Sequence, residues 1–173
     1  MLFDREEIDK IVELKDIDND LLIKKLEVIE TFIRGNYTNN KFYNRFIKFK
    51  APTNQNKILA VHPYLKVGDT IEILESPNAG LYVIEDILKT EMVLNKELFD
   101  FNNNFIIKVE YPADVKEGAI DMLKWFYGAK NKVGLKAETL SRHSVTYEDS
   151  ANFVDGYPKS LLGFLEPYRK VRF

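Results

Sequence analysis

The sequence predicts an α+β protein, a small helical bundle with an inserted small antiparallel β module. Apolar residues recur at helical spacing toward both ends of the chain and at two-residue spacing between Ile58 and Val109. These changes of period divide the chain into an N-terminal helical pair (1–36), an inserted β module (37–111) and C-terminal helices with a tail (112–173). We expect the third segment to pack with the first as one domain, because a chain of 173 residues, 45% of them hydrophobic, can bury an ordinary core.

Two helices are predicted in the N-terminal segment. The first covers residues 4–14, with Asp4 as an acceptable N-cap. The second begins at Leu21 and stops at the pair Gly35-Asn36. Its apolar stripe repeats at i, i+4, i+7 and i+11 and consists of Leu22, Leu26, Ile29 and Ile33. Two helices packed on each other is the simplest arrangement.

The middle of the chain predicts about five short strands. Residues 37–57 are rich in Asn, Tyr and Lys and are interpreted as a connection, with a strand at Phe46–Phe49. Alternating apolar positions then follow at Ile71 and Ile73, Tyr82 and Ile84, Met92 and Leu94, and Phe105, Ile107 and Val109. Residues 76–80 have the proline, asparagine and glycine of a hairpin turn. Such strands are enough for a small antiparallel sheet or barrel.

Helical spacing returns after Pro112, which suits the first position of a helix. This helix is predicted to end near Ala129. We expect its core face to consist of Val115, Ala119, Met122, Leu123 and Phe126.

The rest of the chain is predicted to be less regular. Residues 131–157 are interpreted as a long connector with one strand at Ser144–Tyr147. A short helix at Ser160–Glu166 follows and is expected to end at Pro167. Residues 168–173 contain three cations and two rings, and we expect them to extend away from the core.

Composition excludes several classes of function. The charges nearly cancel, with 25 basic and 27 acidic residues, so no whole-chain field favours nucleic acid. The absence of cysteine removes disulfides, thiolate catalysis and zinc–thiolate sites. No run of about 20 apolar residues predicts a membrane span. His62 and His143 lack the partners of a catalytic arrangement, so we expect no enzyme, no cofactor and no metal.

The acidic stretch Asp16–Asp20, with Glu27, partly matches a calcium-binding loop between two helices. Leu21 stands where that loop requires a glycine for its sharp turn. The alternative is that Asp18 or Asn19 caps the second helix, and this is the interpretation we favour.

Residues 37–50 interleave rings and cations, as surfaces that bind single-stranded nucleic acid do. The other interpretation is a sheet edge or interface with buried rings, whose lysines guard against aggregation. We favour the second, because the net charge does not promise a basic groove. The first would make the chain a monomeric nucleic-acid-binding module that uses the β insertion and this patch.

Several segments together resemble a known family. They are the helical entry at Asp16–Leu22, the helix opened by Tyr111-Pro112 with Leu123-Lys-Trp125, residues 132–147, and the ending 156–168. This combination resembles the head-tail connector (adaptor, head-completion) proteins of long-tailed bacteriophages. Residues 67–82 resemble a small β module of phage neck proteins. The β insertion is a departure from the family's plain helical-bundle members.

The resemblance implies a structural protein of the virion neck, assembled in the bacterial cytoplasm. Its subunits would form a ring, expected to be dodecameric, that docks under the portal protein and extends the channel for double-stranded DNA without sequence recognition. The ring would also present a surface to another head-completion or tail-completion protein. Portal docking would fall to Phe164, Tyr168, Arg169, Lys170, Val171, Arg172 and Phe173. Contacts between subunits would fall to Arg142, His143, Val145 and Tyr147.

Overall fold

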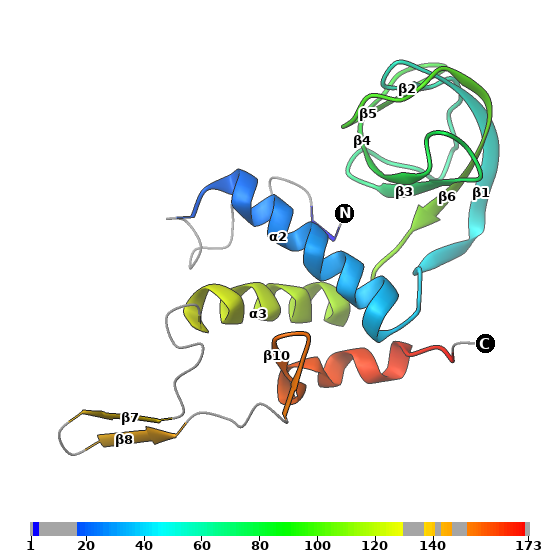
Figure 1. Ribbon diagram of the computed structural model, residues 1–173. Coiled ribbons are helices and arrows are strands. Elements are labelled where there is room, and N and C mark those ends of the chain that lie inside the picture. The colour runs from blue at the N-terminus through cyan, green and yellow to red at the C-terminus, as the bar shows by residue number, and fades with distance from the viewer. Residues whose placement is uncertain (1, 4–16, 130–136, 141–142, 147–151, 172–173) are drawn as a thin grey trace. The chain divides into compact units, whose positions relative to one another are not determined.

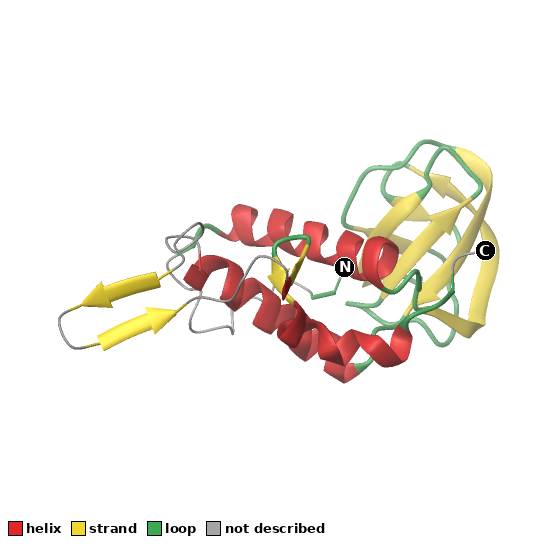
Figure 2. Cartoon of the chain, turned by 60° about the horizontal axis from the view of Figure 1, so that its bottom comes forward, coloured by secondary structure: helices red, strands yellow, loops and turns green. Residues whose placement is uncertain are grey.

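The chain divides into two compact units, a β unit (Met1–Lys10 with Lys41–Pro112) and a helical unit (Ile11–Asn40 with Ala113–Phe173). The computed structural model describes residues 2–3, 17–129, 137–140, 143–146 and 152–171. Helices α2 and α3 lie in one unit and strands β1–β6 in the other (Figure 1, Figure 2). The predicted helix at 4–14 lies outside the described residues.

The β unit is a closed antiparallel barrel of six strands in the order β1-β2-β5-β4-β3-β6. The prediction of a small module with about five short strands is therefore wrong, although the α+β class is confirmed. The strands are β1 (Tyr43–Asn54), β2 (Lys57–Ile58), β3 (Thr70–Leu74), β4 (Gly80–Ile87), β5 (Met92–Leu94) and β6 (Phe101–Val109).

Strand β1 lies largely in the stretch that was predicted to be a connection. Its pairing with β6 shifts register between Tyr43 and Lys48 and again between Ala51 and Thr53. The second shift leaves Pro52, which has no N–H to donate, out of the ladder. These irregularities interrupt the two-residue alternation, and so the sequence pattern concealed a strand of 12 residues.

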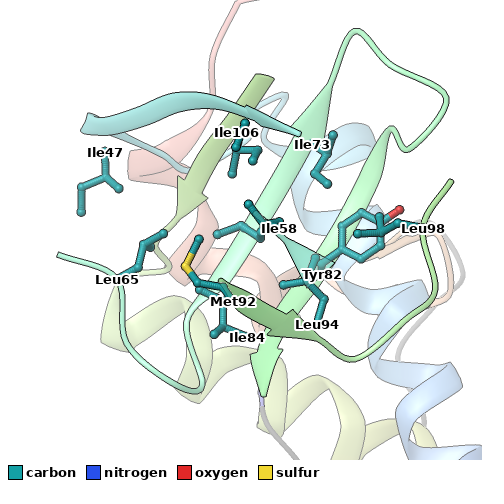
Figure 3. Close-up of a cluster of buried hydrophobic side chains, with 12 residues drawn as sticks. Ile47, Ile58, Leu65, Ile73, Tyr82, Ile84, Met92, Leu94, Leu98 and Ile106 are labelled. Atoms are coloured by element: carbon teal, nitrogen blue, oxygen red, sulfur yellow. The ribbon is translucent and has the colours of Figure 1, made fainter. Parts of the chain in front are cut away.

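The barrel interior is filled with aliphatic side chains from every strand (Figure 3). Ile58, Ile71, Ile73, Ile84 and Ile106 are completely buried. They occupy the inward positions of a two-residue alternation, so burial of these side chains selects the register of each pair of strands.

A buried polar network lies at the turn between β3 and β4. Asn78, predicted as a turn residue, donates from Nδ2 to Thr53 Oγ1 (3.0 Å), Asn104 Oδ1 (3.1 Å) and the Phe99 carbonyl (2.8 Å), and its Oδ1 accepts from the Phe99 N–H (2.7 Å). The hydroxyl of Tyr82 donates to the Asn78 carbonyl. Because the amide satisfies so many buried groups, it fixes the turn to the strands on either side.

The helical unit begins with α2 (Asn19–Thr31), which Asp18 caps by accepting the N–H of Asp20. A π-helical turn, η2 (Phe32–Tyr37), extends α2 past the predicted stop at Gly35. The predicted stripe of Leu22, Leu26, Ile29 and Ile33 is buried.

Helix α3 (Ala113–Ala129) follows Pro112 as predicted and packs against α2 and η4. Its core face is confirmed, since Val115, Ala119, Met122 and Leu123 are completely buried. Phe126 is half-buried, and the Lys25 ammonium lies 3.5 Å from the centre of its ring. Burial lowers the pKa of Lys25.

The 3-10 helix η4 (Lys159–Tyr168) is longer than the predicted last helix. Pro167 lies inside it instead of ending it. The fixed φ of proline suits a helical turn, and the chain becomes extended only at Arg169.

The segment predicted as a long connector contains two hairpins. Strands β7 (Ala137–Leu140) and β8 (His143–Thr146) pair antiparallel, as do β9 (Phe153–Val154) and β10 (Tyr157–Pro158). Asp155 and Gly156 join β9 to β10, and both have positive φ, as a tight hairpin turn requires.

Candidate interaction surfaces

The C-terminal segment (residues 159–171) is the first candidate surface. Its inner side chains, Leu162 and Leu165, are completely buried within the helical unit. Phe164 packs against α3 at Gly118, where an added Cβ would lie 2.4 Å from the ring. Phe164 therefore contacts its own chain, in a place that only glycine leaves open.

The end of this segment is held by side chains at its base. The Tyr168 hydroxyl donates to the Asp114 carboxylate at 2.9 Å, and this bond raises the pKa of Tyr168. The Tyr37 hydroxyl donates to Glu166 at 2.7 Å, and Arg169 pairs with the same carboxylate at 3.2 Å. These two hydrogen bonds lower the pKa of Glu166, and burial first, then the bond to Glu166, raises the pKa of Tyr37.

The backbone beyond Tyr168 also contacts the helical unit. The Lys170 N–H donates to the Thr38 carbonyl at 2.7 Å. Asn40 donates to the Tyr168 carbonyl and Asn39 to that of Val171. The expectation that residues 168–171 extend away from the core is therefore wrong, because polar groups of residues 37–40 hold them without the apolar core that the sequence lacked.

Outward side chains remain on this segment. Arg169 and Lys170 are exposed, and Val171 is 73% exposed. Arg172 and Phe173 lie outside the described residues. Of the positions predicted to dock on a portal, Arg169, Lys170 and Val171 present side chains to solvent.

An aromatic cluster fastens β9 and β10 within the helical unit. Trp125 contacts both Phe153 and Tyr157, with ring centroids 5.9 and 5.6 Å apart, and Phe32 contacts Tyr157 at 5.8 Å. Burial raises the pKa of Tyr157 to about 12. The sequence analysis named Trp125 only within a resemblance, because its partners lie far along the chain.

The residues predicted at a contact between subunits lie at β8. His143 pairs with Leu140 and Val145 with Glu138 in the ladder of β7 and β8. Arg142 and Tyr147 lie outside the described residues.

The outer face of β1 and β6 is the second candidate surface. Lys48 and Lys50 are exposed and stand opposite Ile107 and Phe105 of β6. Phe46 is 89% exposed. The predicted 37–50 patch is split, since Phe42 and Ile47 are buried and Tyr37 belongs to the helical unit. Phe105, from a distant strand, joins it only through the register of the barrel.

Neither surface contains the parts of a metal or membrane site. In the described ranges, no three His, Asp or Glu side chains lie together so that they could hold a metal ion. No described helix has the length and apolarity needed to cross a membrane. Comparison with protein-family models gives no match, and a search among curated proteins finds no similar sequence.

Proposed function

We propose that the protein is a structural component of a phage neck, which forms a ring under the portal after DNA packaging. The ring, expected to be dodecameric, would extend the channel for double-stranded DNA and would offer a surface to the next head-completion or tail-completion protein. The proposal rests on the resemblance of residues 111–173 to connector proteins.

The observation that carries the proposal is the way in which the C-terminal segment is held. Its helix is anchored by buried leucines, but Arg169, Lys170 and Val171 are attached by hydrogen bonds at the surface. Exposed hydrogen bonds contribute only about 1 kcal/mol each to stability, so a partner that offers more can capture these residues. Arginine is among the residues that dominate such interfaces.

The test is to remove residues 169–173 and leave Tyr168, with its bond to Asp114, in place. We expect a folded chain, because every buried side chain of η4 is kept. Added to portal-bearing heads and imaged by negative stain, this shortened chain should fail to form necks, whereas the full chain should form them. A Lys66→Ala variant, altered at an exposed position of the barrel, serves as the control. Normal neck occupancy by the shortened chain would exclude this segment as the docking element, and failure of the full chain would contradict the proposed function.

A further inference from the structure

The outer face of β1 and β6 has the charge of a surface that binds polyanions. Residues 41–112 carry nine cations and nine carboxylates, but four of these cations and none of the carboxylates fall within residues 41–50. Lys57 and Lys108 of the barrel are ion-paired, with Glu91 and Asp69. Among the described residues, no carboxylate pairs with Arg45, Lys48 or Lys50. The positive charge on this side of the barrel is therefore available to a ligand.

The same face presents aromatic rings. Lys50, Phe105 and Leu74 form one row across β1, β6 and β3, and Lys48, Ile107 and Glu72 form the next. Residues directly opposite each other share a face of the sheet, and the other face of these strands fills the barrel core. Phe105 is only partly buried, so its ring is accessible beside the Lys50 ammonium.

A local turn places Phe46 in solvent. The Asn44 side chain accepts the N–H groups of Phe46 (2.9 Å) and Ile47 (3.1 Å), and its own amide donates to Glu110 at 2.7 Å. Ile47 points into the core and is 8% exposed, whereas its neighbours Phe46 and Lys48 are exposed. An 89% exposed phenylalanine held by a defined turn is preorganised to contact a ligand.

We propose that this face binds single-stranded nucleic acid, with Arg45, Lys48 and Lys50 on phosphates and Phe46 and Phe105 stacking on bases. Cations interleaved with rings are the features that such strands require, because every base offers a flat face to an aromatic ring. An extended acidic peptide fits less well. In a closed barrel both sides of each strand are paired with neighbours, so a peptide cannot add to the sheet through its backbone. This inference does not depend on the proposed function.

The test is fluorescence anisotropy of the full chain with a labelled oligothymidylate of about 20 nucleotides in about 50 mM salt. We expect binding that is tighter than to a duplex of the same length or to polyglutamate. Phe46→Ala should weaken it about tenfold without changing the salt dependence, since stacking on a ring contributes about 1–3 kcal/mol. Lys48→Gln with Lys50→Gln should lower the slope of log K against log salt by about 1.4, which is about 0.7 for each phosphate contact.

Matched controls lie elsewhere on the barrel. Phe99, which is 70% exposed, is the control for Phe46, and the exposed Lys66 and Lys89 are the controls for the two lysines. We expect Phe99→Ala and Lys66→Gln with Lys89→Gln to bind as the unaltered chain does. No binding to the oligonucleotide, equal losses in the control variants, or tighter binding to polyglutamate would each overturn the proposal. Neck formation with portal-bearing heads is measured separately, so the two proposals can fail independently.

Discussion

At the scale of single residues, Gly118 is set by the ring that covers it. Glycine in the interior of a helix normally costs about 1 kcal/mol relative to alanine. We expect Gly118→Ala to destabilise the protein by about 1–3 kcal/mol, because the new Cβ would lie 2.4 Å from the Phe164 ring. Gly128→Ala in the same helix meets nothing within 4 Å and should be neutral or stabilising. Urea denaturation measures both, and a stable Gly118→Ala variant would show that Phe164 is free to move.

Tyr157 is the residue whose substitution is expected to stabilise the protein. Its ring is buried among Trp125 and Phe32, but its hydroxyl has no hydrogen-bond partner among the described residues. A buried hydroxyl without a partner costs about 1–3 kcal/mol. Tyr157→Phe should therefore raise the free energy of unfolding by about 1 kcal/mol, as measured by urea denaturation. A loss of stability would show that the hydroxyl has a partner.

The same tyrosine gives a prediction for alkaline pH. Its pKa is about 12 in the folded protein against an ordinary value of 10.0. A folded pKa that is raised supplies stability below pH 10, and this stability is lost as pH rises from 10 toward 12. The Tyr157→Phe variant should lose less stability over this range than the unaltered chain. Equal losses in thermal melts would contradict the assignment.

At the scale of elements, the barrel depends on a polar residue at a turn. Asn78→Ala would leave the Phe99 N–H and the Asn104 carboxamide oxygen without this partner in a buried place. We expect a loss of about 3 kcal/mol, since each buried group left unpaired costs about 1–3 kcal/mol. Asn102→Ala, at an exposed position of β6, should change stability by less than about 0.5 kcal/mol. Chemical denaturation compares the two, and equal effects would mean that the network does not hold the turn.

At the scale of the whole molecule, the two connections between the units run side by side on the barrel. The Glu110 N–H donates to the Phe42 carbonyl at 2.9 Å, and the rings of Phe42 and Tyr111 lie 5.2 Å apart. A chain of residues 11–173 in which a linker of about six Gly and Ser residues replaces 41–112 should therefore fold into the helical unit. Circular dichroism and cooperative melting measure this, and Gly118→Ala should lower its melting temperature as well. An unfolded product would show that the helical unit needs the barrel.

The sequence by itself determined the regular parts of this protein. The stripe of α2 and the core face of α3 were predictable, because in a helix the side chains that share a face recur at fixed spacing along the chain. The hairpin turn at residues 76–80 was predictable for the same local reason, since proline, asparagine and glycine favour it whatever surrounds them.

Only the tertiary structure decided what depends on partners distant in sequence. Closure of the barrel through β1 and β6 and the row that joins Lys50 to Phe105 depend on register between strands far apart in the chain. The attachment of residues 168–171 to residues 37–40 depends on hydrogen bonds across more than 120 positions. Gly118 faces Phe164 because two helices pack there. The amino-acid pattern encodes local period and burial, whereas the identity of each long-range partner emerges only when the buried faces meet.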